Sequence, residues 1–193
     1  LGLGDERAAL IADFLVDGYT APGRHYHNLD HVARMLDEVE ALGSRFHDRD
    51  AVELALFFHD AVYEPSRSDN EVRSALALRD LLNDSLPLPL LERAEAMILA
   101  TRNHAATGDP DVDLSILAAP WPEYARYAEG VMREYAPIFG DDVYRKGRVE
   151  KFLLPMLARA RIFLTDAYAP RQADAMENLT RETAELDSGR ISG

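Results

Sequence analysis

A histidine and an aspartate, His59 and Asp60, stand at the end of a run of mostly hydrophobic residues that begins at Val52. A carboxylate that is carried into a hydrophobic interior needs a compensating positive charge. A buried ion pair with an arginine is one explanation, but the sequence has no Arg or Lys between Asp50 and Pro65. Imidazole and carboxylate are both good ligands for a divalent metal ion. The doublet is therefore interpreted as part of a metal site.

Two further segments carry side chains of the same kinds. His27 and His31 are four residues apart, which places them near one face at the start of a predicted helix. Farther along, His104 is followed by Asp113, a carboxylate among residues that favour burial. Each has an ordinary structural explanation when taken alone. An isolated histidine is usually a core or surface residue, and Asp113, or Asp111 in its place, can cap a short helix.

The composition limits the kinds of site and partner. The chain has no cysteine, which excludes disulfides, thiolate zinc sites and cysteine nucleophiles, so a metal would be held by nitrogen and oxygen. The net charge of -13 would repel a nucleic-acid polymer and favours small ligands. No apolar run approaches the roughly 20 residues that span a bilayer, and a secretory signal is not recognisable. We expect a cytoplasmic protein with no membrane partner, and leave a homodimer open.

Hydrophobic residues recur with helical periodicity along nearly the whole chain, and no stretch shows sustained alternation of apolar and polar residues. The sequence therefore predicts an all-α protein with a single domain over residues 1–193 and a frayed tail from about residue 187. The expected helices are Asp5 to about Gly18 with Asp5 as N-cap, Asn28 as N-cap to Gly43, Asp48 to His59–Asp60, Asp69 to Asn83, Leu90 to about His104, Asp111 to Leu117, Pro122 to about Ile138, Asp141 to Leu157 and Pro170 to about Leu186.

A histidine, then a His-Asp doublet, then a distant aspartate, on separate helices of an all-α domain, resembles the HD-domain superfamily of metal-dependent phosphohydrolases. The resemblance extends to the branch known as predicted metal-dependent HD phosphohydrolases. The resemblance implies a single-domain HD-domain helical bundle. The segments that carry it are Arg24–Val32, Phe58–Tyr63, Asp69–Ala75, Thr101–His104 and Asp111–Leu117, followed by Arg133–Tyr135 and Tyr144–Arg148.

The resemblance also implies that His31, His59, Asp60 and Asp113 hold one divalent metal ion. Imidazole ligands favour a transition metal (Mn, Co, Ni, Fe or Zn) and make Mg less suitable. A divalent ion with open positions polarises a phosphoryl oxygen and generates hydroxide near neutral pH. The implied activity is hydrolysis of a small phosphate ester or nucleotide by metal-activated water, with a small phosphorylated substrate as the partner.

Three further residues are candidates for catalytic roles, two of them through the resemblance. In similar cyclic-nucleotide phosphodiesterases the earlier histidine of the segment protonates the leaving group, which maps acid catalysis to His27. In the ppGpp hydrolases of the superfamily an acidic pair orients the attacking water, and Glu64 stands where its second member would be. Tyr63 replaces the first member, which argues against a guanosine tetraphosphate substrate. His104 is open between a phosphate contact, a second acid, a ligand of a second ion and a structural hydrogen bond.

The basic residues Arg133, Lys146 and Arg148 are candidates for substrate binding, because a guanidinium fork matches phosphate oxygens. Their alternative is an ordinary solvated position on a helix.

Two other functions are compatible with such a fold. An HD-type di-iron oxygenase needs extra ligands, and only one more histidine lies between Asp60 and Asp113, so a second ion would have to use Glu64, Glu71 or His104. A catalytically silent nucleotide-binding module is the other alternative. The presence of His27 and a complete ligand set argues against it.

Overall fold

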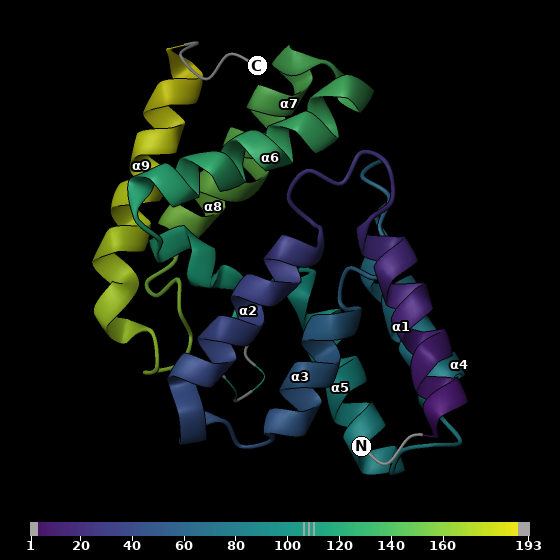
Figure 1. Ribbon diagram of the computed structural model, residues 1–193. Coiled ribbons are helices and arrows are strands. Elements are labelled where there is room, and N and C mark those ends of the chain that lie inside the picture. Colours follow the sequence, from purple (N-terminus) through teal and green to yellow (C-terminus); the bar gives the residue numbers. More distant parts are fainter. Residues whose placement is uncertain (1–3, 106, 108, 110, 189–193) are drawn as a thin grey trace. The chain divides into compact units, whose positions relative to one another are not determined.

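The computed structural model describes residues 4–105, 107, 109 and 111–188 (Figure 1). Every regular element in these residues is helical and none is a strand, which confirms the all-α prediction. The chain divides into two compact units, Leu1–Asp109 and Pro110–Gly193. The expectations of a single domain and of an HD-domain bundle stay predictions.

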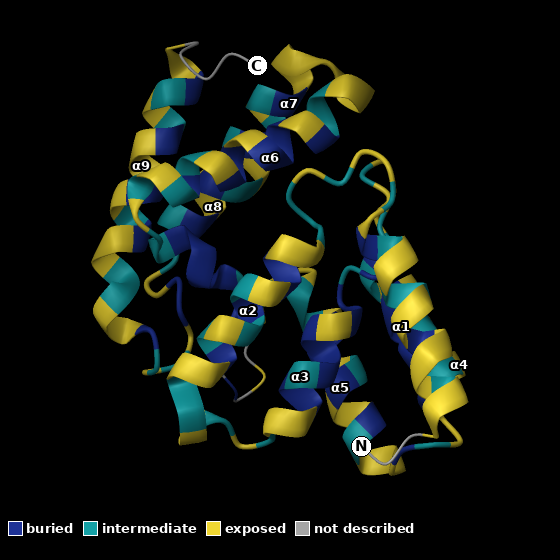
Figure 2. Ribbon diagram, in the orientation of Figure 1, coloured by how far each residue is buried: buried dark blue, intermediate teal, exposed yellow. Residues whose placement is uncertain are grey.

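The first unit contains five α-helices, and α3 lies at its centre. Helix α3 packs against α5, and α5 also packs against α4. Figure 2 shows that α3 is buried along much of its length, as expected for the hydrophobic run that precedes His59. The helices are α1 (Asp5–Tyr19), α2 (Leu29–Leu42), α3 (Arg49–Phe58), α4 (Asn70–Leu82) and α5 (Leu88–Thr101), with a 3-10 turn η1 (Gly43–Arg45) after α2.

Capping residues account for several helix ends. The side chain of Asn28 accepts hydrogen bonds from the backbone at the start of α2, and Gly43 ends that helix with a φ of 57°. The carboxylate of Asp48 accepts from the N–H of Ala51 and starts α3. The prediction for α1 was wrong by one residue: Gly4 is the N-cap and Asp5 is the first helical residue, where its charge suits the helix dipole.

Two predicted helix boundaries differ in other ways. Helix α5 begins at Leu88, between two prolines that both suit a first turn, and it ends at Thr101 rather than near His104. In the second unit, the helix expected over 141–157 is interrupted by a π-helical turn. Pro155 explains the change, because its ring nitrogen has no hydrogen to donate to the preceding turn.

The second unit is built from α6, α9 and the broken helix between them. Helix α9 packs against α6 and against the π-helical turn. The predicted tail lies mostly outside the described residues, since α9 ends at Asp187 and the description ends at residue 188. The elements are η2 (Asp113–Ala118), α6 (Trp121–Phe139), α7 (Asp141–Arg148), the π-helix η3 (Val149–Leu153), α8 (Leu154–Leu157), η4 (Ala169–Arg171) and α9 (Gln172–Asp187).

A buried ion pair links α7 to α9 in the second unit. Arg148 donates from Nε to Oε1 of Glu182 over 2.9 Å and from Nη2 to Oε2 over 3.1 Å. The hydroxyl of Tyr124 also donates to Glu182, and Arg148 donates to the hydroxyl of Tyr127 over 2.8 Å. Burial raises the pKa of Tyr127 to about 12, so this hydroxyl stays neutral at physiological pH. The ion pair is therefore hydrogen-bonded on both sides.

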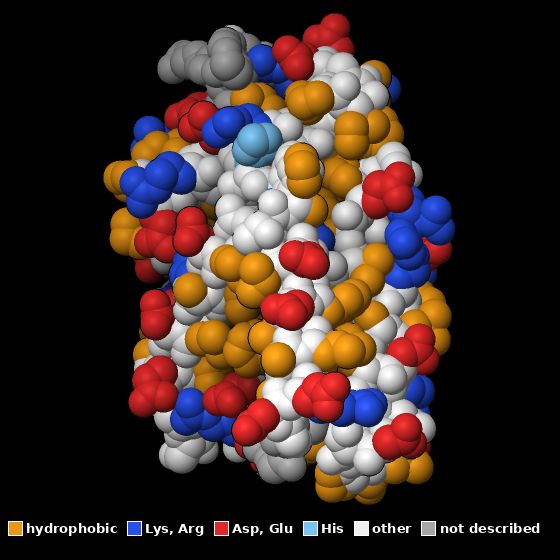
Figure 3. Space-filling model, turned by 45° about the vertical axis from the view of Figure 1, so that its right-hand side comes forward, with side chains coloured by type: hydrophobic (Ala, Val, Ile, Leu, Met, Phe, Trp, Pro, Cys, Tyr) orange, Lys and Arg blue, Asp and Glu red, His pale blue; other side chains and the backbone are white. Residues whose placement is uncertain are grey.

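The surface shows no segregation of one charge on the face drawn in Figure 3, where acidic side chains lie among basic and hydrophobic ones. Among the described residues no helix is both long enough and apolar enough to cross a membrane.

Replacing Arg148 by Met should strongly destabilise the protein, because the carboxylate of Glu182 would stay buried without its cation. We expect a loss of about 3–5 kcal/mol in the free energy of unfolding, measured by urea denaturation. The control is Arg161→Met, which removes an exposed ion pair with Asp166 in the same unit and should cost less than about 1 kcal/mol. Equal losses in the two variants would contradict this account.

Candidate metal centre

His31 is fixed by the first turn of α2. The side-chain oxygen of Asn28 accepts from the backbone N–H of Asp30 over 3.0 Å and from that of His31 over 3.2 Å. This capping arrangement defines where the helix starts and so sets the backbone position of the histidine. The imidazole of His31 then lies in the interior, with 3% of the residue exposed.

His59 is the C-cap of α3 and is also buried, with 2% of the residue exposed. Its backbone N–H donates to the carbonyl oxygen of Ala55 over 2.8 Å, so the helical hydrogen-bonding pattern continues up to it. The side-chain Nδ1 lies 2.9 Å from the carbonyl oxygen of Leu56. A carbonyl can only accept, so Nδ1 of His59 must carry a hydrogen.

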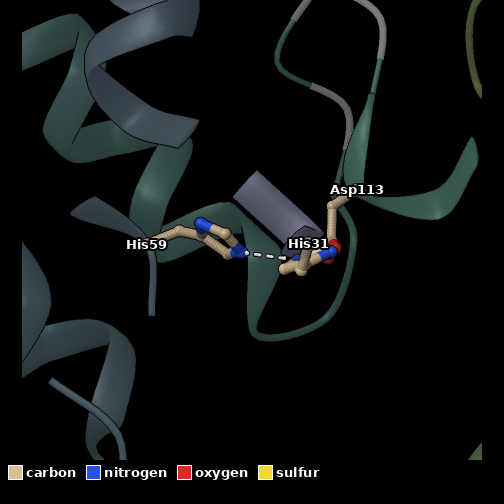
Figure 4. A group of neighbouring side chains, drawn as sticks. All are labelled: His31, His59 and Asp113. Atoms are coloured by element: carbon tan, nitrogen blue, oxygen red, sulfur yellow. Dashed lines mark hydrogen bonds between the residues drawn. The ribbon is translucent and has the colours of Figure 1, made fainter. Parts of the chain in front are cut away.

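The outer nitrogen of His59 faces two other groups in the first unit. Its Nε2 lies 3.3 Å from Nε2 of His31, as the dashed line in Figure 4 shows. It also lies 3.0 Å from Oδ2 of Asp60, whose side chain is 14% exposed. Two imidazoles and one carboxylate thus converge on the end of α3. Figure 4 also labels Asp113, which belongs to the second unit.

This arrangement requires a proton or a cation between the facing groups. Because Nδ1 of His59 carries a hydrogen, a neutral ring has a lone pair at Nε2. That lone pair would face the carboxylate oxygen of Asp60, which is also an acceptor, over only 3.0 Å. A proton held on His59 or on Asp60, or a bound cation, removes this repulsion. A hydrogen bond from Nδ1 to a backbone carbonyl is the usual arrangement of a histidine that binds metal through Nε2.

The spacing fits a divalent transition metal. Nitrogen ligands lie roughly 2.0–2.1 Å from zinc, so two of them on a tetrahedral ion are about 3.3 Å apart. The two imidazole nitrogens are separated by this distance. Three ligating groups also leave positions open for water and substrate. The residues of the first unit are therefore suited to hold such an ion, although the ligand roles stay predictions.

The turn that carries His59 and Asp60 is held by side chains from α1 and α4. The backbone N–H of Asp60 donates to the hydroxyl of Tyr19 over 3.3 Å. Ser74 exchanges two hydrogen bonds of 3.1 Å with the backbone of Val62. The amide of Asn70 makes a similar pair with the backbone of Glu64, over 3.1 and 2.9 Å.

Sequence reasoning did not identify the supporting roles of Tyr19, Asn70 and Ser74. Asn70 and Ser74 belong to a segment that carries the family resemblance, but nothing in their spacing indicates which backbone groups they bind. Their burial at the start of a helix, where exposed polar residues are normal, would have been the only signal. It is visible only once the fold is known.

The remaining predicted residues of the first unit have different environments. His27 is half-buried, and its ring centroid lies 6.0 Å from that of His31 and 4.4 Å from that of Tyr63. The carboxylate of Glu64 is exposed and accepts from the hydroxyl of Ser66 over 2.8 Å. His104 follows α5 with a φ of 49°, a left-handed conformation that histidine tolerates better than most residues. The catalytic roles of these residues stay predictions.

The second unit holds the other predicted residues. Asp113 is the first residue of η2 and Val112 is its N-cap, so neither Asp111 nor Asp113 occupies the capping position. The choice between the two aspartates as the distal ligand stays open.

The three basic candidates of this unit have different environments. Arg133 is exposed in α6, and Lys146 is exposed with its Nζ 3.9 Å from Glu150. Arg148 is buried and already donates to Glu182 and Tyr127, so a phosphate would have to compete with both. Substrate binding by the three stays a prediction.

No protein-family model, curated protein or solved structure matches this chain. Membership of the HD-domain superfamily therefore rests on the resemblance of the sequence segments and stays a prediction.

Replacing Gly18 by Ala should disturb the turn that carries Asp60. A Cβ atom at Gly18 would lie 2.6 Å from the carbonyl oxygen of Ala61, so backbone would have to shift. We expect a loss of about 1–3 kcal/mol in the free energy of unfolding and weaker Co²⁺ binding, measured by denaturation and calorimetry.

Gly147→Ala is the matched control, because Gly147 is also the penultimate residue of its helix but has open space around its Cβ position. It should stabilise the protein by up to about 1 kcal/mol. A neutral effect of Gly18→Ala on both stability and Co²⁺ affinity would show that the close approach is unimportant.

Proposed function

We propose that this protein is a metal-dependent phosphohydrolase that acts on a small phosphate ester or nucleotide, and that His31, His59 and Asp60 hold its metal ion. The observation that carries the proposal is Nε2 of His59, which faces an imidazole nitrogen at 3.3 Å and a carboxylate oxygen at 3.0 Å inside the protein. Asp113 is the fourth ligand predicted from the sequence. The expected ion is one divalent transition metal, and a cytoplasmic location is part of the same proposal.

The residues of the proposed site have different roles in the reaction. When bound, a divalent ion supplies polarisation of the phosphoryl oxygen and a lowered pKa of water. His31 and His59 can serve as ligands through Nε2 only when this nitrogen carries no hydrogen. The hydrogen bond from Nδ1 of His59 to the carbonyl oxygen of Leu56 supports this, because it places the ring hydrogen of His59 on Nδ1. His27, beside the pair, can hold a proton on a ring nitrogen for the departing oxygen. Glu64 and His104 keep their predicted roles near the reacting water and phosphate.

Removal of a ligand should abolish metal-dependent turnover. We expect His59→Gln and Asp60→Asn each to weaken binding of Mn²⁺, Co²⁺ or Zn²⁺ by about 10–100-fold or more, measured by calorimetry on chelator-treated protein. Hydrolysis should fall in parallel in a screen of phosphomonoesters, phosphodiesters and nucleotides with each metal.

The controls for the ligand variants are His25→Gln and Asp50→Asn, which change exposed residues of the same unit and should retain binding and turnover. Equal phosphate release by native protein and Asp60→Asn would refute the proposal. Oxygen consumption by an iron-loaded sample in place of phosphate release would favour the di-iron oxygenase.

His27→Gln should separate metal binding from proton transfer. We expect kcat for an alkyl phosphate to fall by about 10²–10⁴-fold, since its leaving oxygen needs a proton, while metal affinity stays near that of the native protein. A p-nitrophenyl ester needs no such proton and should lose far less activity. Equal losses on the two esters would remove His27 from the acid role.

A further inference from the structure

Arg24 connects the loop before α2 to the turn that follows α3. Its Nη1 donates to the carbonyl oxygen of His27 over 2.9 Å and to that of Asp60 over 2.7 Å. Its Nη2 donates to the carbonyl oxygen of Ala61 over 3.3 Å. One guanidinium group therefore bonds the backbone of two segments that are more than 30 residues apart in the sequence.

Aromatic rings flank the same guanidinium. Its central carbon lies 5.3 Å from the ring centroid of Tyr19 and 4.9 Å from that of Tyr63. Tyr63 in turn lies against the imidazole of His27, with ring centroids 4.4 Å apart. A planar guanidinium group suits such contacts better than a compact ammonium group. Tyr63, which takes the place of an acidic residue in part of the superfamily, thus connects Arg24 to His27.

The loop that contains Arg24 makes mainly short-range backbone bonds. Ala21 N–H donates to Gly18, Arg24 N–H to Ala21 and Asn28 N–H to Tyr26. Bonds of this kind shape the loop but do not fix its distance from the turn at residues 59–61. The side chain of Arg24 adds hydrogen bonds that join the loop directly to this turn.

An arginine close to a phosphohydrolase site would ordinarily be assigned to substrate phosphate. Here, however, three N–H bonds of Arg24 are directed to backbone carbonyl oxygens. A phosphate bound to the same N–H groups would have to displace them, which would release His27 from Asp60. These three bonds favour a structural role for Arg24 over binding of substrate through the same N–H groups.

We propose that Arg24 is a positioning residue, which holds the His27 imidazole in register with Asp60 through backbone bonds and through Tyr63. The inference rests on the proposed function, because Arg24 would keep the proposed acid, His27, near the proposed metal ligand, Asp60. A displacement of about 1 Å in a reacting group can cost roughly 100-fold in rate, so a rigid connection of this kind matters for turnover more than for binding.

The test compares Arg24→Met and Arg24→Lys with a matched control, Arg7→Met. Arg7 also donates to a backbone carbonyl in the same unit, that of Leu81 over 3.0 and 2.8 Å. We expect Arg24→Met to lower kcat for an alkyl phosphate by about 100-fold with KM changed by less than about threefold, and Arg24→Lys to recover little. Arg7→Met should leave both constants near native values.

A second measurement uses the protein without metal. The Cε1–H resonance of His27, assigned with His27→Gln, should be shifted by the ring current of Tyr63, and Arg24→Met should remove most of that shift.

Chemical rescue is a separate experiment, which measures phosphate ester hydrolysis. Added methylguanidinium should restore part of the activity of Arg24→Ala, and methylammonium should not.

Three results would overturn the inference. A rise in KM of about tenfold or more at unchanged kcat would make Arg24 a substrate contact. Equal losses in Arg7→Met would make the effect one of general stability. An unchanged His27 resonance in Arg24→Met would show that the connection does not position the imidazole. If native protein hydrolyses no phosphate ester with any metal, the proposed function fails, and the resonance still decides whether Arg24 positions His27.

Discussion

Two acceptors that face each other in a protein interior set the main constraint on this molecule. Nε2 of His59 and Oδ2 of Asp60 are 3.0 Å apart. Because Nδ1 of His59 donates its hydrogen to a backbone carbonyl oxygen, Nε2 carries an unshared electron pair unless a cation or a second proton occupies it. Nε2 of His31, 3.3 Å from Nε2 of His59, is a third possible ligand atom beside them. A proton held between the two groups relieves this repulsion, and the divalent ion of the proposal would relieve it without disturbing the bond to Leu56.

The turn that carries His59 and Asp60 is held by side chains from neighbouring helices. The bonds from Tyr19, Ser74 and Asn70 to the turn at residues 60–64 satisfy backbone groups that a helix would otherwise satisfy. Gly18 permits α1 to approach this turn, since a side chain there would meet the oxygen of Ala61. The short polar residues of α4 and the glycine of α1 are thus explained by the turn they support and not by the helices that contain them.

The sequence predicted those features that depend on neighbouring residues. Both ends of α2 follow from Asn28 and Gly43, because a capping amide and a left-handed glycine act within one helical turn. The π-helical interruption before Pro155 was missed because it depends on how the proline is accommodated, which periodicity does not show. The bonds of Arg24 to the turn after α3 were missed for a different reason: they join residues 36 and 37 positions apart, and a single sequence contains no measure of such a distance.

The same distinction applies to the site. The residue types of His31, His59 and Asp60 indicated metal chemistry, but their spacing could not show that two imidazole nitrogens would meet at a distance suited to one ion. These three side chains come from the start of α2 and the end of α3, and their supports come from α1 and α4, all within the first unit. Three protein ligands are the usual number in a catalytic zinc site, where further positions serve water and substrate. The first unit alone thus supplies three side chains of the kinds that hold such an ion, two imidazoles and a carboxylate.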